Sequence, residues 1–445
     1  MLILLSIWLA VGIGLIVCQG RWGSAGLPLA YFLGLSLIHV PGAILYLDAD
    51  EGNVTKVGFE QTIIGMVAFL VGVIIARYAF VRPPGRQASA GQSEDFTPRR
   101  ITVLDRLALL YVIVGAIVSF VALKLAANIP SATAVVAPLG SLIIVGACVR
   151  LWVAIESRNR LKFWCTMALL PLLPLATLIQ GGFLGGGTVW GITIVSFLFA
   201  QSKRRLVYFL FAPAVFFVGL SVFVNYMAVR SEFRDLVWHQ QAGIGDRLSR
   251  VTDSFQHFEW LDLSNFRHRK AIDLRLNQNE FVGIAVERLE LGAVEYAYGG
   301  TVAKVAMGLI PRILWPDKPV VGGGGSVVHD FTGLEFAEGT SFGAGQVFEF
   351  YVNFGSLGVI GGFLLYGWLI GRIDLSTIKY LQQGDQRRFL LWFLPGLALL
   401  ASGGNLLEIV VGTVSSVIVG YSIGYLLPGR WAARDMAGAI IRGTT

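Results

Sequence analysis

The dominant pattern along this 445-residue chain is a series of long, continuous apolar runs separated by short polar segments. A helix needs about 20 mainly apolar residues to cross the core of a bilayer. The runs do not alternate apolar with polar residues, as the strands of a membrane barrel do. They predict about eleven spanning helices, at roughly 2–18, 25–47, 60–81, 103–123, 134–153, 163–180, 185–201, 206–227, 345–371, 388–402 and 405–427.

Composition leads to the same class of protein. Hydrophobic residues make up 55% of the chain and charged residues only 14%, against about a quarter charged in soluble domains. The net charge of +7 would suggest nucleic acid in a soluble protein, but here the charges lie mostly in short loops. We therefore expect an all-α polytopic membrane protein that binds no nucleic acid.

Basic residues are concentrated in one alternate set of the regions between the apolar runs. That set includes Arg77, Lys203 and Arg430, whereas the opposite short loops hold only Lys56 and Lys124. Cytoplasmic loops carry the excess of Lys and Arg. The asymmetry therefore predicts an N-terminus outside the cytoplasm and a C-terminus inside it.

This topology divides the chain into four parts. Residues 1–227 hold the first eight helices, and 228–344 form one large loop outside the cytoplasm. Residues 345–427 hold the last three helices, and 428–445 form a cytoplasmic tail. Within the loop, 280–310 is moderately amphipathic, which favours a helix lying at the membrane surface.

The large loop gathers arginines near the point where the chain leaves the membrane. Arg230 and Arg234 are four residues apart, which puts them on one face of a helix. Arg267 and Arg269 follow in FRHRK, and Arg312 follows in IPRILWPDKP. A guanidinium is always charged and binds phosphate oxygens two at a time, so this group suits a lipid-linked pyrophosphate. Because acidic residues outnumber basic ones in the loop, the alternative is that each arginine pairs with a nearby carboxylate.

Three further side chains are candidates for acid–base chemistry. Glu349 is expected near the outer end of its helix, and Glu408, in GGNLLEIVV, within the outer leaflet, where ionisable groups are paired or functional. The alternatives are a helix-start carboxylate for Glu349 and a structural tie for Glu408. His329, beside Asp330, resembles an acid–base pair, against the alternative of a solvated histidine. No His/Cys set has metal-ligand spacing, so neither a metal nor another cofactor is expected.

Two segments carry a family resemblance. IPRILWPDKP at 310–319, a glycine-rich gap and GQVFEFYVNFGSLGVIGGFLLYG at 345–367 resemble the bacterial O-antigen polymerases, also called Wzy-type, and related oligosaccharide repeat-unit polymerases. The long loop between the eighth and ninth spans is similar too. The resemblance implies a GT-C-like, metal-independent membrane glycosyltransferase. Such an enzyme joins units carried on undecaprenyl pyrophosphate at the periplasmic face of a bacterial inner membrane. A flippase and a chain-length regulator would be its partners.

The resemblance gives each candidate residue a role. The basic group that would contact pyrophosphate or sugar consists of Arg230, Arg234, Arg267, Arg269, Arg312 and Lys318. Glu349 or His329 would accept the proton of the attacking hydroxyl. Tyr351 would stack on a sugar ring, and Glu408 would contact the substrate.

Two other functions remain open at this point. An O-antigen ligase-type glycosyltransferase uses the same lipid pyrophosphate chemistry but moves finished chain to a lipid acceptor. A transporter or flippase of lipid-linked oligosaccharide would need polar groups along a path through the membrane, and the predicted spans hold few.

Overall fold

The described part of the chain consists of helices, and no strand occurs in it. The computed structural model describes residues 1–80, 98–126, 132–181, 183–202, 205–238, 243–310, 314–315, 317, 324–335, 343 and 345–426. The helices before the large loop are α1 (Leu2–Trp22), α2 (Leu27–Leu45), α3 (Val54–Phe80), α4 (Pro98–Ile117), η1 (Val118–Ala122), α5 (Leu123–Ala126), α6 (Ala132–Gly140), α7 (Leu142–Glu156), α8 (Arg160–Met167), α9 (Leu172–Gly181), α10 (Gly185–Gln201) and α11 (Arg205–Trp238). The remaining helices are α12 (Ile244–Gln256), α13 (Phe266–Leu276), α14 (Gln278–Glu290), α15 (Gly300–Gly308), α16 (Gly324–Thr332), α17 (Gly345–Gln383), α18 (Gln386–Ala398) and α19 (Leu406–Leu426).

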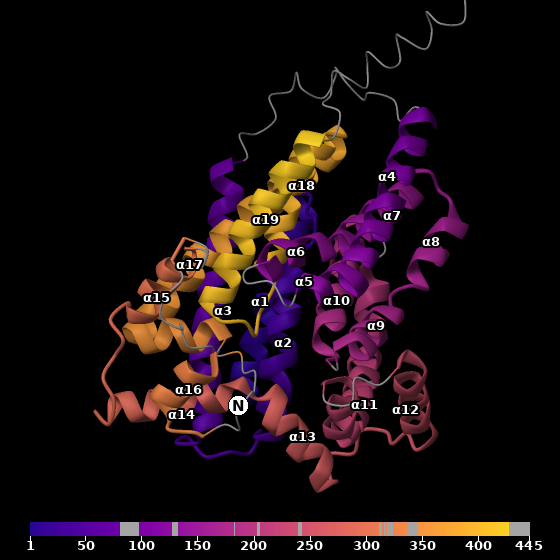
Figure 1. Cartoon of the computed structure of the whole chain (residues 1–445). Helices are drawn as coiled ribbons and strands as arrows, with labels where there is room; N and C mark the ends of the chain where they lie inside the picture. The colour runs from indigo at the N-terminus through magenta and orange to yellow at the C-terminus, as the bar shows by residue number, and fades with distance from the viewer. Residues whose placement is uncertain are drawn as a thin grey trace, which may run out of the picture.

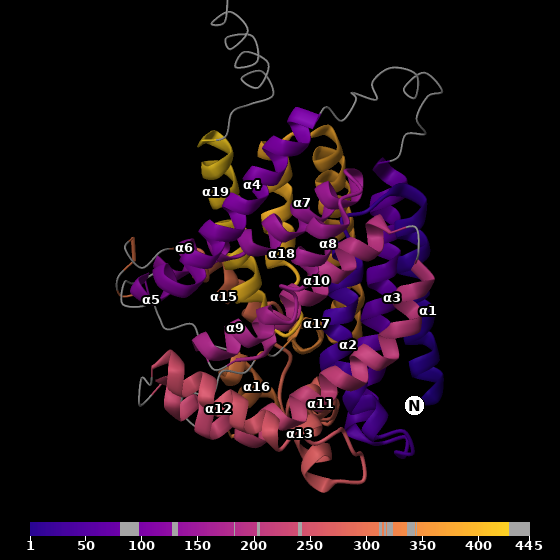
Figure 2. The same ribbon diagram turned by 90° about the vertical axis from the view of Figure 1, so that its right-hand side faces the viewer.

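Most of these helices run side by side in one bundle (Figures 1 and 2). Nine described helical segments are long and apolar enough to cross a bilayer, which confirms the all-α polytopic membrane fold. Two predicted spans correspond to shorter helices, α10 with 17 residues and α18 with 13. The predicted spans 134–153 and 163–180 each hold two helices in succession, α6 with α7 and α8 with α9.

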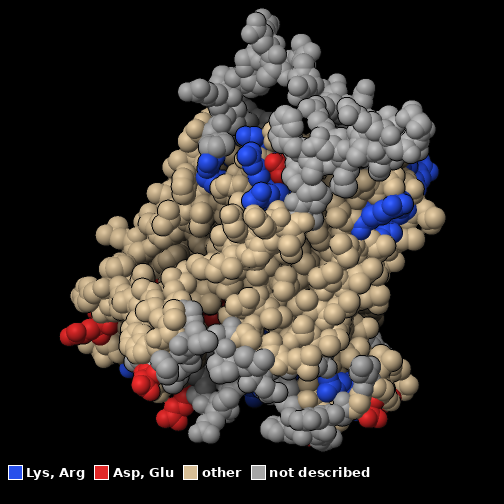
Figure 3. Space-filling view, turned by 45° about the horizontal axis from the view of Figure 1, so that its top comes forward, with Lys and Arg blue, Asp and Glu red and all other residues tan. Residues whose placement is uncertain are grey.

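The bundle has two ends that differ in content. α1 begins at the end that carries α12, α13 and α14, which we call the loop end (Figure 1). α3 and α19 finish at the opposite end, which we call the basic end. Figure 3 shows most of the visible Lys and Arg side chains towards the basic end and most of the visible Asp and Glu side chains towards the loop end.

α17 is two helices joined at a sharp break. Phe354 and Gly355 leave the helical conformation, and Gly355 has φ 61° and ψ −153°, a region that is essentially restricted to glycine. The piece at 345–353 folds back on the longer piece. The Phe350 and Phe363 ring centroids lie 5.5 Å apart, and a side chain at Gly358 would collide with the Phe350 backbone. The helix predicted at 345–371 therefore begins only after the break, and the buried segment before it carries Glu349.

α14, the first part of the predicted helix over 280–310, packs closely on α3 at the loop end. Gly58 of α3 and Gly283 of α14 permit the close approach of these helices. A Cβ atom at Gly58 would lie 1.9 Å from the carbonyl oxygen of Asn279, and one at Gly283 would lie 1.8 Å from that of Val54. His39 Nδ1 also lies 2.6 Å from Asn279 Oδ1, and Asn279 Nδ2 donates to the His39 carbonyl oxygen at 2.8 Å.

Candidate functional site

Three arginine side chains come together on α11 and α13. Tyr226, Arg230 and Arg234 lie at successive four-residue steps on α11 and so share one face. Arg275 of α13 lies near enough to Arg230 and Arg234 for their charges to interact. The Arg234 guanidinium also lies over the Phe183 ring, 5.9 Å from its centroid. We call Arg230, Arg234 and Arg275 the arginine cluster.

The arginine cluster holds positive charge where water has only partial access, because all three side chains are half-buried. Burial, and after it the charges of Arg230 and Arg234, lowers the pKa of the Arg275 guanidinium. Like charges held together at reduced dielectric repel one another, and a bound anion offsets that repulsion. The arrangement therefore suits an anion with several oxygen atoms, such as a diphosphate.

The other predicted basic residues are not part of this cluster. Arg267 and Arg269 are exposed and lie more than one helical turn from Arg275 along α13. Arg312 and Lys318 lie outside the described residues. The structure thus brings together two of the predicted arginines and adds Arg275, which was not among the predicted site residues.

Glu349 is deeply buried, with 3% of its surface exposed. Its Oε2 atom accepts a hydrogen bond from the backbone N–H of Leu406, at the start of α19, where the helix dipole favours negative charge. Glu408 follows in the same turn, near enough for the two carboxylates to repel each other. Asn405 caps this helix by accepting from the Glu408 backbone N–H at 2.8 Å. Glu349 therefore ties the helical segment at 345–353 to α19.

Tyr351 and His329 have different surroundings. The Tyr351 hydroxyl donates to Glu290 Oε1 at 3.4 Å, and its buried ring lies 6.4 Å from that of Tyr296. His329 is exposed on α16, and its Nδ1 donates to the Leu334 carbonyl oxygen at 3.0 Å. The Tyr351 ring is therefore covered by protein, whereas His329 faces the surface.

A second acidic group, which the sequence did not reveal, lies between α13, α14 and the end of α2. The Tyr46 hydroxyl donates to Asp273 Oδ2 at 3.0 Å, and Asn277 Nδ2 donates to Asp273 Oδ1 at 2.8 Å. Burial, with the Asp273 charge second, raises the pKa of Glu280. The same two causes raise the pKa of Tyr46 to about 12. A carboxyl group with a raised pKa is suited to proton transfer near neutral pH.

The arginine cluster and Glu349 lie in different parts of the bundle. α11 packs on α9, α12 and α13, whereas α17 packs mainly on α2, α3, α14 and α18. Figure 1 shows the same separation between α11 and α17. Glu280, by contrast, follows Arg275 after only a few residues. Among the described residues, no three His, Cys, Asp or Glu side chains are grouped so as to hold a metal ion.

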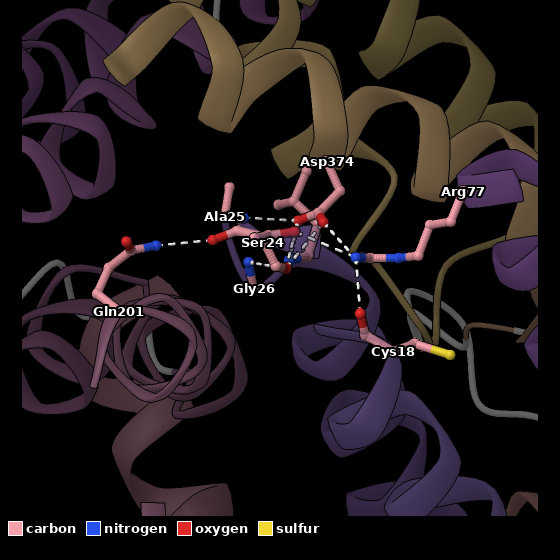
Figure 4. A network of polar contacts seen from close by, with 9 residues as sticks. Cys18, Ser24, Ala25, Gly26, Arg77, Gln201 and Asp374 are labelled. Carbon is pink, nitrogen blue, oxygen red and sulfur yellow. Dashed lines mark hydrogen bonds and ion pairs between the residues drawn. The ribbon is translucent and has the colours of Figure 1, made fainter. Parts of the chain in front are cut away.

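A buried ion pair joins α3 to α17 near the basic end (Figure 4). Arg77 Nη2 lies 2.8 Å from Asp374 Oδ2, and neither side chain is exposed. Arg77 Nη1 donates to the carbonyl oxygens of Cys18 and Gly23, each at 3.1 Å. Arg77, expected among the basic residues of the cytoplasmic side, is therefore part of the protein interior. Buried charges are tolerated when they are paired and hydrogen-bonded in this way.

The turn between α1 and α2 completes the binding of the Asp374 carboxylate. Ser24 Oγ donates to Asp374 Oδ2 at 2.8 Å, and the backbone N–H groups of Ala25 and Leu27 donate to Oδ1 at 3.0 and 3.1 Å. Gln201 Nε2 of α10 donates to the Ser24 carbonyl oxygen at 2.7 Å (Figure 4). We call Arg77, Asp374 and Ser24 the buried clamp. Its carboxylate oxygens are engaged by the protein itself, so it fastens helices together.

Comparison with known proteins gives one match. A family model described as a domain of unknown function (DUF8712) matches residues 97–379. The matched range includes the arginine cluster, Glu280 and Glu349. No curated protein and no solved structure matches the chain.

Proposed function

This chain belongs to the DUF8712 family, whose function is unknown, and we propose that it is a membrane glycosyltransferase. In this proposal it joins oligosaccharide repeat units carried on undecaprenyl pyrophosphate into a surface polysaccharide. The observation that carries the proposal is the convergence of Arg230, Arg234 and Arg275. Three permanent charges held together provide forked donors for the two phosphates of such a lipid.

The surface of α11 supports a ligand that is attached to lipid. Many of its apolar side chains are exposed, among them Leu206, Leu210 and Val215. Exposed apolar surface on a membrane-crossing helix faces the lipid tails. Arg230 and Arg234 lie farther along the same 34-residue helix. A polyprenyl chain would therefore lie along α11 while its diphosphate reaches the arginine cluster.

The charge distribution supports a periplasmic position for the loop end. Lys and Arg side chains gather towards the opposite end (Figure 3), and cytoplasmic surfaces carry the excess of such residues. The proposed location is a bacterial inner membrane, with a periplasmic N-terminus and a cytoplasmic C-terminus. A flippase would supply the lipid-linked units, and a chain-length regulator would be a further partner.

The proposed reaction is a displacement at the anomeric carbon of the donor sugar. A hydroxyl oxygen of the acceptor saccharide forms the new glycosidic bond as the bond from that carbon to the diphosphate breaks. The diphosphate leaves with the electron pair, and the arginine cluster stabilises its developing charge. The hydroxyl proton passes to a carboxylate, for which Glu280, a few residues after Arg275, is the candidate, because Glu349 lies in a different part of the bundle from the arginine cluster.

The test is an incubation of the purified full chain with a defined undecaprenyl-pyrophosphate-linked oligosaccharide. We expect a ladder of longer saccharides together with released undecaprenyl pyrophosphate. The Arg230→Gln/Arg234→Gln double variant should lower kcat/KM by at least about 100-fold, because each hydrogen bond to a charged group contributes about 1.5–3 kcal/mol. The control is Arg106→Gln/Arg158→Gln, which removes two exposed arginines towards the basic end and should keep the activity.

The products separate this proposal from its alternatives. An enzyme that transfers saccharide to a lipid acceptor without lengthening it would be a ligase. Movement of the lipid across a bilayer with no new glycosidic bond would indicate a flippase, and the proposal would fail. Glu280→Gln should remove the acidic limb of the pH–rate profile, whereas Glu349→Gln, which changes a carboxylate away from the arginine cluster, should keep it.

A further inference from the structure

We infer that the segment between α12 and α13, together with the start of α13, is a binding surface for acidic phospholipid. This surface, here called the lipid patch, consists of Trp260, Leu263, Phe266, Arg267 and Lys270. All five side chains are exposed. The inference does not depend on the proposed enzymatic activity, because it concerns the surrounding bilayer and not a substrate.

The lipid patch is fastened beside the apolar part of α11. The Leu261 N–H donates to Ser221 Oγ at 3.0 Å. The Asn225 amide exchanges two hydrogen bonds with the backbone of Glu259, at 2.7 and 3.0 Å. Ser221 is sixteen residues beyond Arg205, a rise of about 24 Å, which is less than the ~30 Å thickness of a bilayer core. The segment therefore lies at the level of lipid.

Large apolar side chains of the lipid patch face outward at this level. Trp260 is 59% exposed, and its ring stacks on Phe217 of α11 with centroids 5.9 Å apart and an interplanar angle of 11°. Phe266 is 66% exposed, and Leu263 is exposed as well. Tryptophan is enriched at the boundary between lipid and water, where its ring contacts acyl chains and its N–H stays near water. Lipid is thus the occupant that fits this surface.

The basic side chains of the lipid patch lie beside these apolar ones. Lys270 Nζ is 5.9 Å from the centroid of the Phe266 ring, one helical turn away, and Arg267 follows Phe266 directly. Within the described residues, neither Arg267 nor Lys270 takes part in an ion pair. Basic groups next to an apolar anchor bind the phosphates of anionic lipid head groups.

The neighbouring acids are engaged elsewhere. Glu259 Oε2 lies 3.1 Å from His268 Nε2, and His268 Nδ1 accepts from the Asp262 backbone N–H at 3.1 Å. Asp262 Oδ1 accepts from the backbone N–H and the hydroxyl of Ser264, at 2.8 and 2.7 Å. His268 is buried, so these bonds also hold the bend that presents Trp260. The charges of Arg267 and Lys270 therefore remain directed outward.

The test follows the fluorescence of Trp260 in the full chain purified in detergent. Subtracting the emission of Trp260→Phe from that of the wild type isolates this one tryptophan, and titration with brominated phosphatidylglycerol reports lipid contact there. We expect quenching at lower concentration than with brominated phosphatidylcholine. Each basic residue near a membrane contributes about 1 kcal/mol, which is about fivefold in affinity, so Arg267→Gln/Lys270→Gln should weaken phosphatidylglycerol binding about 25-fold.

The control is again Arg106→Gln/Arg158→Gln, which should leave the quenching curve unchanged. An equal shift in this control would show a general charge effect and overturn the inference. Absence of quenching by either brominated lipid would overturn it too, because Trp260 would then face water or another protein. Equal quenching by the two lipids would exclude recognition of the acidic head group.

Discussion

Arginine is used in two opposite ways at the two ends of this molecule. In the buried clamp, Arg77 is fully enclosed and meets one carboxylate together with two carbonyl oxygens. In the arginine cluster, Arg230, Arg234 and Arg275 are only half-buried and lie near one another, so their charges repel. The first arrangement is complete without a ligand. In the proposed function, the second gains free energy when a diphosphate binds.

This difference separates stability from binding. A buried charge that loses its partner destabilises the fold strongly, because water cannot replace the lost interaction. A half-buried charge among like charges contributes little to stability, and its removal relieves repulsion. Substitutions at the two ends should therefore have opposite effects on folding and on function, and three experiments test this contrast.

The largest effect is expected for Asp374→Ala in the buried clamp. The variant leaves Arg77 buried without its carboxylate, which costs about 3–5 kcal/mol of unfolding free energy. Denaturant unfolding in mixed micelles measures the loss. The double variant Arg77→Met/Asp374→Leu, which leaves no buried charge, should recover a large part of it. A loss below about 1 kcal/mol in Asp374→Ala would mean that the clamp is not essential to stability.

A much smaller effect on stability is expected for Arg230→Gln in the arginine cluster. Arg230 makes no ion pair with another described residue, so the unfolding free energy should change by no more than about 0.5 kcal/mol. Removing its repulsion with Arg234 and Arg275 should make the change slightly stabilising. The proposed polymerisation activity, measured in the same preparation, should nevertheless fall. If Arg230→Gln lowered the unfolding free energy as much as Asp374→Ala does, the arginine cluster would contribute to stability as the buried clamp does, and the prediction would be wrong.

The smallest effect is expected for Glu280→Gln, as a dependence of stability on pH. Since burial and Asp273 raise the pKa of Glu280 in the fold, its ionisation opposes folding above that raised pKa. The opposition disappears as the pH falls through the raised value towards the ordinary value of 4.5. Glu280→Gln should therefore raise Tm at neutral pH, and its advantage over the wild type should shrink in acid. A constant difference in Tm across this range would assign the effect to packing.

Hydropathy predicted the membrane fold because length and apolar content decide whether a helix can span a bilayer. It did not predict how closely α14 packs on α3, because that packing depends on Gly58 and Gly283 and not on apolar periodicity. Nor did it predict the break at Gly355, since the sequence around it is apolar on both sides.

The candidate site was predictable only where its residues are neighbours in sequence. The four-residue spacing of Arg230 and Arg234 indicated a shared helix face. Arg275 joins them through the packing of α13 on α11, which spacing along the chain cannot reveal. Arg77 and Asp374 carried a usable signal, because charges within or next to apolar runs require partners. The two charges are almost 300 positions apart, however, and only the fold pairs them.

The contact of Gly58 with α14 also determines where α14 lies against α3. α14 carries Glu280, Glu287, Arg288 and Glu290 within 13 residues, so it is too polar to enter a bilayer by itself. Its position therefore depends on packing against α2, α3 and α17. Because neither Gly58 nor Gly283 leaves room for a methyl group, a relative that carries alanine at either position has to hold α14 farther from α3. Glycine at both positions in a related sequence therefore indicates that α14 can pack as closely on α3 as it does here.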